Sequence, residues 1–195
     1  KCPEISVSKK EDKMGQRASD TVQVVFNNVK VSKENMIGKE SEGWVVAMKT
    51  LDKSRPLVAS ASIGVARRAM ECAREYGLER KAFGKAISEY QAIQFMLADM
   101  AKDVEAGRLL SWKAAWLLDQ NLPSTYTSSI AKCFGSDAAV KASIDAVQVY
   151  GGYGYMKDYP VEKLMRDAKV LQIYEGTNQI QRLVIARELL KSLFY

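Results

Sequence analysis

The sequence predicts a mainly α-helical protein: an antiparallel four-helix bundle preceded by the last strands of an incomplete β-domain. From Gly43 onward, apolar residues recur at the spacing of amphipathic helices. The first forty residues instead hold short β-branched runs between turn-forming residues. We therefore expect two domains, a β remnant over residues 1–40 and a helical bundle over residues 41–195.

Two short strands are expected at the front of the chain. Ile5-Ser6-Val7 and the run 21–26 are rich in β-branched residues, and Asn27-Asn28 and Gly38 supply turn chemistry. Strands with so few partners would leave exposed edges. The pattern therefore implies a partner for them, either further chain or another subunit.

Helices are predicted over 44–79, 91–120, 125–149, 161–166 and 178–193. Within the first, Pro56 predicts a kink or a break, and small residues should line one face for close packing (Ala59, Ala61, Gly64 and Ala66). The second carries a stripe at i, i+3, i+4 and i+7 spacing, made of Ile93, Met96, Leu97, Met100, Val104 and Gly107. Ser124 or Thr125 could cap the third helix, and Gly151-Gly152 should end it.

Composition narrows the classes of function. Hydrophobic residues make up 47% of the 195 residues and charged residues 27%, as in ordinary globular proteins. The net charge of +6 suits anionic ligands, but the absence of a basic run argues against nucleic acid. Three widely spaced cysteines without histidine favour a reducing compartment and argue against zinc. We expect no membrane span and recognise no signal peptide. The start at Lys1 is compatible with a fragment, a split subunit or a processed product.

The most informative segment is the loop Tyr174-Glu175-Gly176-Thr177, between two predicted helices. Its one carboxylate precedes a glycine that allows a ligand to approach the backbone. A chain without histidine must abstract protons with a carboxylate, lysine, tyrosine or cysteine. Glu175 is therefore the best candidate for a general base.

Three other segments combine unusual residues, each with a plain structural alternative. The run from Arg80 to Lys85 could grip a pyrophosphate, or could be a solvated loop anchored by Phe83. The run 148–155 holds three glycines and three tyrosines that could admit a ligand, or could be a helix cap and tight turn. Asp52 to Pro56 could meet a ligand or form a salt-bridged kink.

Together, these segments resemble the acyl-CoA dehydrogenase family, in its order and at its spacing. The resemblance rests on Asp52-Lys53-Ser54-Arg55-Pro56, Glu79-Arg80-Lys81-Ala82-Phe83-Gly84-Lys85, Gln148-Val149-Tyr150-Gly151-Gly152-Tyr153-Gly154-Tyr155, Arg166-Asp167-Ala168-Lys169 and Ile173-Tyr174-Glu175-Gly176-Thr177. It extends over the whole chain and is greatest to the straight short- and medium-chain members.

The resemblance implies FAD-dependent oxidation of a fatty acyl-CoA to the trans-2-enoyl-CoA. Glu175 matches the family's catalytic base, which takes the α-proton as hydride passes to flavin N5. The matching cofactor positions are Arg80, Phe83, Gln91, Gln148, Gly151, Gly152, Thr177 and Gln179, of which Arg80 and Phe83 match a motif that reaches a neighbouring subunit's FAD. The matching substrate positions are Asp52, Arg55, Tyr174, Gly176 and Arg187.

Two positions refine this resemblance. Some relatives place the base where this chain has Ser54, which cannot act as a base, so the chain resembles the majority branch. Ala82 stands where many relatives have threonine or serine, which removes one hydroxyl contact to FAD. Full members also carry an N-terminal helical domain and a complete β-domain, which supply the flavin-ring wall and much of the substrate channel.

By resemblance, the expected partners are a fatty acyl-CoA, an electron-transfer flavoprotein and further copies in a homotetramer. The expected compartment is the mitochondrial matrix or the bacterial cytoplasm. Two alternatives remain open: a non-catalytic helical oligomerisation module, which a colourless tetramer would support, and an acyl-CoA oxidase, which would release peroxide.

Overall fold

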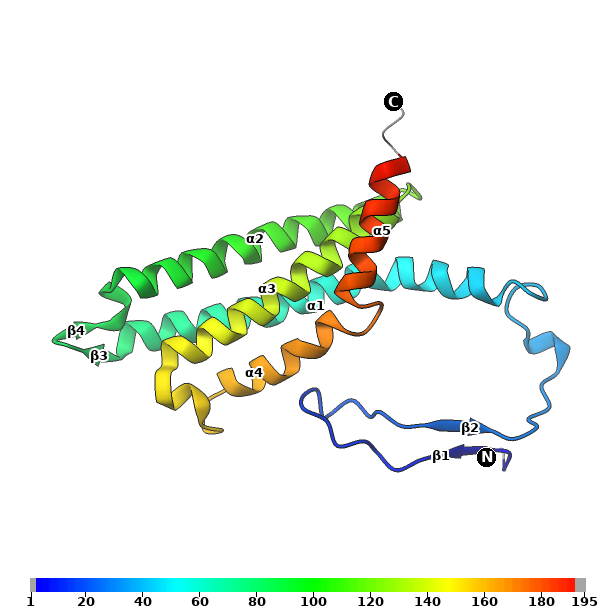
Figure 1. Cartoon of the computed structure of the whole chain (residues 1–195), viewed down its shortest axis with the longest axis horizontal. Coiled ribbons are helices and arrows are strands. Elements are labelled where there is room, and N and C mark those ends of the chain that lie inside the picture. The colour runs from blue at the N-terminus through cyan, green and yellow to red at the C-terminus, as the bar shows by residue number, and fades with distance from the viewer. Residues whose placement is uncertain (1–2, 192–195) are drawn as a thin grey trace.

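The computed structural model describes residues 3–191 and confirms the mainly helical class. Its helices are α1 (Gly43–Glu79), α2 (Gln91–Asp119), α3 (Thr125–Tyr150), α4 (Val161–Ala168) and α5 (Asn178–Lys191), joined in part by 3-10 turns at Lys33–Asn35, Ile87–Glu89, Gly151–Tyr155 and Lys169–Gln172. Each predicted helix is present, and the predicted end of the last one at Leu193 lies outside the described residues. The long helices α1, α2 and α3 lie side by side, and α4 and α5 both pack against α3 (Figure 1).

The two strands predicted at the front also form. β1 (Ile5–Val7) pairs antiparallel with β2 (Val24–Phe26), and all six residues are exposed. The pair lies apart from the bundle in Figure 1, and the loop between the strands reaches α4, where Arg166 donates to the Met14 carbonyl at 2.8 Å. The exposed edges fit the expectation of further chain or a partner. A domain boundary near residue 40 remains a prediction.

A second hairpin, which the sequence did not predict, follows α1. β3 (Lys81–Ala82) pairs with β4 (Lys85–Ala86) through a two-residue turn. Both turn residues have positive φ, 51° at Phe83 and 86° at Gly84, as a type I′ turn requires. The predicted loop between the first two helices is therefore a short, ordered hairpin.

Helix α1 continues through Pro56 without the break that the sequence allowed. Proline lacks the N–H that would donate to the carbonyl four residues earlier, and this normally weakens a helix. Here Pro56 and its neighbours Arg55, Val58 and Ala59 are all buried. Packing of this stretch against the bundle offsets the lost hydrogen bond, so α1 does not break at Pro56, and the alternative of a kink stays a prediction.

The close approach of α1 and α3 depends on small residues, although not on the set predicted. Ala59 and Ala66 are buried, but Ala61 and Gly64 are exposed, because they lie on the other side of the helix. The buried small residues include Ala59, Ser62, Ala66, Ala69 and Ala73 on α1 and Ala131, Ala138, Ala139, Ala142 and Ala146 on α3. Their spacing of three and four residues is that of one helix face.

The predicted stripe of α2 faces this core. Met100, Val104 and Gly107 are buried, and the remaining apolar members pack against the same cluster. Gly107 is the tightest point, since a Cβ built there would lie 2.2 Å from Cδ1 of Ile63. The absence of a side chain at Gly107 therefore sets how closely α2 approaches α1.

We expect Gly107→Ala and Gly64→Ala to change stability in opposite directions. Overpacking at Gly107 should destabilise the protein by about 1–3 kcal/mol. This is more than the stabilisation expected from the higher helix propensity of alanine. At Gly64 a Cβ meets nothing within 4 Å, so the exposed substitution should stabilise α1 by up to ~1 kcal/mol. Urea unfolding of both variants measures the difference, and equal effects would contradict the packing described here.

The two ends of α3 differ in how well the sequence predicted them. The Ser124 side chain makes no capping hydrogen bond, and the Thr125 hydroxyl donates to Asp52 Oδ2 at 3.0 Å. The predicted cap is therefore wrong, because the hydroxyl instead joins α3 to α1. The end at Gly151 is confirmed, where φ is 59°.

No helix within residues 3–191 has the length and apolar character needed to cross a bilayer.

Candidate functional site

Glu175 lies in a left-handed turn between the Lys169–Gln172 turn and α5. Its φ is 57° and that of Gly176 is 85°, a conformation that L-residues other than Asn and Asp seldom adopt. A Cβ on Gly176 would lie 2.7 Å from Gln181 Nε2. Gly176 is thus required both for its φ and for the space beside it, which supports the sequence argument for this glycine.

The carboxylate of Glu175 is held by a serine on α1. The Ser54 hydroxyl on α1 donates to Glu175 Oε2 at 2.6 Å, and also lies 3.2 Å from the Leu51 carbonyl oxygen. Serine at this position therefore orients the carboxylate. From the sequence, Ser54 is only a residue that cannot act as a base. Its hydrogen bond to Glu175 was not predicted.

Two buried side chains, Gln181 and Lys132, donate hydrogen bonds to the backbone carbonyls of the loop. The sequence did not predict either contact. Gln181 Nε2 donates to the carbonyls of Glu175 and Gly176 at 3.1 and 3.0 Å. Lys132 Nζ donates to the Gly176 carbonyl at 2.8 Å and to Asn178 Oδ1 at 2.9 Å. By contrast, the N–H of Glu175 has no hydrogen-bond acceptor within residues 3–191. The loop thus presents the carboxylate and the free N–H of the same residue, Glu175.

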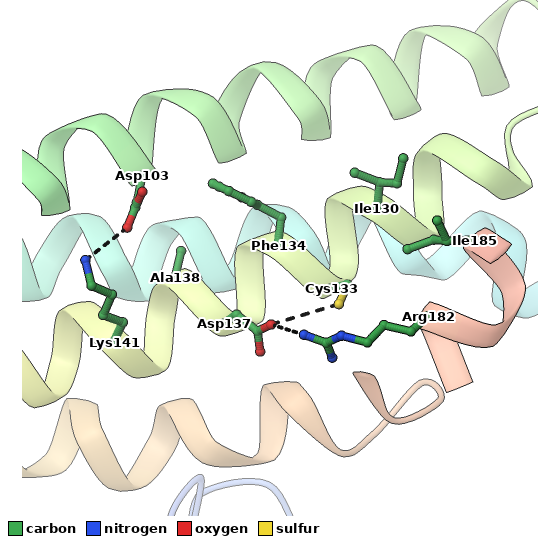
Figure 2. Close-up of a pocket in the computed structure, with 9 residues that line it drawn as sticks. All are labelled: Asp103, Ile130, Cys133, Phe134, Asp137, Ala138, Lys141, Arg182 and Ile185. Carbon is green, nitrogen blue, oxygen red and sulfur yellow. Dashed lines mark hydrogen bonds and ion pairs between the residues drawn. The ribbon is translucent and has the colours of Figure 1, made fainter. Parts of the chain in front are cut away.

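The start of α5 is tied to α3 through Asp137. Asn178 Nδ2 donates to Asp137 Oδ1 at 2.7 Å, and Arg182 Nη2 donates to Asp137 Oδ2 at 2.8 Å. Figure 2 shows Asp137 on α3 facing Arg182 on α5, with Cys133 beside them at the edge of a cavity of about 410 Å³. Burial raises the pKa of the Cys133 thiol, which favours its neutral form. This arrangement fixes α5 relative to α3 and so fixes one end of the Glu175 loop.

The predicted substrate residues on α1 form an ion pair near the loop, in which Arg55 is buried and Asp52 is partly exposed. Arg55 Nη1 donates to Asp52 Oδ1 at 2.6 Å, so the salt-bridged alternative for this segment is present. Arg55 is only 5% exposed, and its Nε has no partner within residues 3–191. Asp52 also lines a cavity of about 720 Å³ between α1 and the α2–α3 turn. Arg55 itself does not line that cavity, so of the pair only Asp52 faces it.

The other predicted substrate residues are less closely grouped. Tyr174 is 37% exposed on the loop itself. Arg187 lies farther along α5, where its Nε pairs with Glu188 at 3.0 Å. No hydrogen bond or ion pair in the described part of the chain joins Arg187 to the Glu175 loop. Tyr174 and Gly176 flank Glu175 in the loop, and a substrate role for Arg187 stays a prediction.

The predicted cofactor residues fall into two groups. Arg80, Gly151 and Gly152 line one cavity of about 550 Å³ at the far end of α3. Thr177 and Gln179 line another of about 490 Å³ beside the Glu175 loop. The two cavities are about 21 Å apart along the axis of α3, taking 1.5 Å per residue between Asp137, which lines the second cavity, and Gly151, which lines the first.

The residues of the Arg80 cavity fit an anionic, flat ligand such as the dinucleotide part of FAD. The Arg80 guanidinium lies 5.7 Å from the centre of the Tyr153 ring. A Cβ built on Gly151 or Gly152 meets nothing within 4 Å, so these glycines leave the backbone open to a ligand. Tyr76 stacks on Tyr150 with ring centres 4.0 Å apart and makes the wall rigid.

The remaining cofactor positions lie on exposed surface around this cavity. Gln148 is exposed on the last turn of α3, and Gln91 is exposed at the start of α2. Phe83 is 96% exposed at the tip of the β3–β4 hairpin, and its carbonyl and that of Ala82 accept the Tyr90 hydroxyl at 3.3 and 2.8 Å. The sequence argument missed Tyr90, which braces the hairpin. An exposed, braced aromatic side chain is well placed to contact another subunit.

Comparison with known proteins agrees with this arrangement. Residues 41–190 match the family described as acyl-CoA dehydrogenase, C-terminal domain. An acyl-CoA dehydrogenase of Bacillus subtilis is 51% identical over 188 residues, which is 96% of this chain and 50% of the relative. The mitochondrial short-chain specific acyl-CoA dehydrogenase of Mus musculus is 46% identical over 190 residues, covering 97% and 46% of the two chains.

Solved structures give the same result. The butyryl-CoA dehydrogenase of Megasphaera elsdenii aligns with a TM-score of 0.95 at 46% identity, covering 97% of this chain and 49% of that one. PigA, solved with FAD and proline, aligns with a TM-score of 0.93 at 26% identity, covering 96% and 49%. The chain thus spans about half the length of the relatives it matches. It belongs to the acyl-CoA dehydrogenase family, and its helical bundle matches the family's C-terminal domain.

Proposed function

We propose that this chain supplies the catalytic base and part of the FAD site of an enzyme that oxidises a fatty acyl-CoA to the trans-2-enoyl-CoA. The observation that carries the proposal is the Glu175 loop, which presents an oriented carboxylate and a free N–H side by side. These are the two groups that removal of an α-proton from a thioester needs: a base for the proton, and a donor for the oxygen on which negative charge develops.

In this proposal the thioester carbonyl accepts a hydrogen bond from the Glu175 N–H. That bond polarises the carbonyl and makes the α-proton more acidic, and the Glu175 carboxylate then takes the proton. Ser54 holds the carboxylate during this step through its 2.6 Å hydrogen bond. Bound FAD supplies the acceptor for the hydride that leaves the β-carbon. The Asp52–Arg55 pair and Tyr174 would contact the substrate beside the loop.

The two groups of cofactor residues support a shared FAD site between subunits. The two cavities lie about 21 Å apart along α3 and would contact two FAD molecules, one near the chain's own base and one belonging to a neighbour. Arg80, Phe83, Gln91, Gln148, Gly151 and Gly152 would hold the neighbour's dinucleotide, and Thr177 and Gln179 would lie near the chain's own flavin. Exposed Phe95, Trp112 and Trp116 on α2 provide apolar surface for assembly into the proposed homotetramer.

The physiological context follows from the same family membership. We propose a short- or medium-chain fatty acyl-CoA as substrate and an electron-transfer flavoprotein as the acceptor of the electrons. The compartment would be the mitochondrial matrix or the bacterial cytoplasm, and relatives of both origins are found.

Anaerobic mixing of the purified complete protein with butyryl-CoA tests this function. Loss of the oxidised-flavin absorbance near 450 nm, with crotonyl-CoA as product and no peroxide when air is admitted with an electron acceptor, is the expected result. A colourless oligomer would support the alternative of a non-catalytic module. Stoichiometric peroxide would instead support an oxidase, and either outcome would overturn the proposal.

A further inference from the structure

Lys132 on α3 is the largest of the fully buried side chains in the described part of the chain. It makes no salt bridge within residues 3–191, since its two acceptors are the neutral oxygens of Gly176 and Asn178. Burying an ammonium without a carboxylate partner is costly. A methionine would fill a similar volume without that cost, so packing alone does not account for a lysine here.

The environment of Lys132 acts on its charge from several elements. Burial lowers the pKa of the Lys132 ammonium to about 8, while nearby Cys133 and Asp137 on α3 oppose that shift. Arg55 on α1 lowers the pKa further, and Glu175 on the loop raises it. The ammonium therefore retains its proton below pH 8 and, in that form, makes its strongest hydrogen bonds.

The two acceptors of Lys132, the Gly176 carbonyl and the Asn178 side chain, indicate the role of this lysine. Two consecutive left-handed residues, Glu175 and Gly176, turn their carbonyls towards the interior of the bundle. Gln181 donates to both carbonyls, and Lys132 adds a second, charged donor to the Gly176 carbonyl. Lys132 bonds the Gly176 carbonyl and, at the same time, the Asn178 side chain at the start of α5. It thus joins α3, the loop and α5 at one point.

We propose that Lys132 is a positioning residue for the reaction: it holds residues 174–177 in the conformation in which Glu175 presents its carboxylate and its N–H together. This inference rests on the proposed function and deepens it. Lys132 itself touches neither the substrate nor the reacting atoms. Its contribution should therefore appear in the rate of the chemical step.

Replacement of Lys132 by methionine in the complete FAD-bound protein tests the role. We expect the rate of flavin reduction by saturating butyryl-CoA, measured per bound FAD, to fall about 10²-fold, as a displacement near 1 Å can produce. The Kd for butyryl-CoA should stay near the wild-type value, and Lys132→Arg should recover part of the rate. Lys141→Met, on the same helix and half exposed with ion pairs to Asp99 and Asp103, is the matched control and should behave as wild type.

The outcomes separate this inference from the proposed function. If butyryl-CoA reduces the wild-type flavin and Lys132→Met reacts at the wild-type rate, the positioning role is wrong and the function stands. If the wild-type flavin is not reduced, the function fails, and the role fails with it. A loss limited to FAD content, with a normal rate per bound FAD, would show a purely structural lysine and would also overturn the role.

A measurement on the wild-type protein covers the case in which Lys132→Met does not fold. The rate of flavin reduction at saturating butyryl-CoA should be highest below pH 8 and decline above it, because the ammonium deprotonates near that value. Cys133 also faces this region, so the profile is repeated in Cys133→Ser, where the decline should persist. A rate that stays constant from pH 7 to well above pH 8 would contradict the role of the charged lysine.

Discussion

Replacement of Glu175 by glutamine is expected to lower the rate of flavin reduction by acyl-CoA by about 10³-fold or more. The amide has nearly the shape of the carboxylate and can still accept the Ser54 hydroxyl, so the loop should keep its conformation. It cannot accept the α-proton. No histidine exists in the chain to replace it, and the nearest hydroxyl, Ser54, is not a base at neutral pH. Stopped-flow absorbance near 450 nm measures the effect.

The matched control for this change is Glu105→Gln on α2. It makes the same chemical replacement at an exposed residue that pairs with Arg108, and neither residue belongs to the proposed site. Flavin reduction in this variant should proceed at the wild-type rate. Equal losses in the two variants would show a general effect of removing negative charge and would remove the support for Glu175 as the base.

Replacement of Arg80 by methionine is expected to weaken FAD binding about 10- to 100-fold. Hydrogen bonds to a charged partner contribute about 1.5–3 kcal/mol each, and within residues 3–191 Arg80 is the only arginine or lysine that lines the Gly151–Gly152 cavity. Titration of the apoprotein with FAD, followed by flavin fluorescence, gives the Kd.

Lys81→Met provides the comparison for Arg80. Lys81 is adjacent in sequence and exposed on β3, but it does not line the cavity. Its loss should leave the Kd for FAD close to the wild-type value. If both variants weaken binding equally, the interaction is with the general positive charge of the hairpin, and the specific role of Arg80 is excluded.

The helices could be predicted because their apolar residues repeat at one period over many turns. The stripe from Ile93 to Gly107 on α2 is an example, and all of its members contact the core. Pro56 is a different case. Local propensity favours a kink or a break at a proline, whereas burial of Arg55, Pro56 and Val58 favours continuation of the helix. Tertiary packing decides such a case, and it is not visible in the segment itself.

The loop that holds Glu175 could be predicted from its residues, but the side chains that hydrogen-bond to this loop could not. In the sequence, Lys132 resembles any other lysine of a helix. Its position on the helix is the distinguishing feature, because Ser128, Ser136 and Ser143 recur on the same buried face of α3. That position was a usable signal for a buried lysine. The partners of Lys132 lie 44 and 46 residues away, so only the folded chain identifies them. Ser54 and Glu175 are 121 residues apart and illustrate the same limit.

Exchange of the substrate's α-hydrogen tests the central claim most directly. The complete protein is incubated with butyryl-CoA in D2O without an electron acceptor, and deuterium at the α-carbon is measured by mass spectrometry. We predict that the wild-type protein catalyses incorporation of deuterium at the α-carbon and that Glu175→Gln does not. Exchange in Glu175→Gln at the wild-type rate would show that another group removes the proton and would contradict the account.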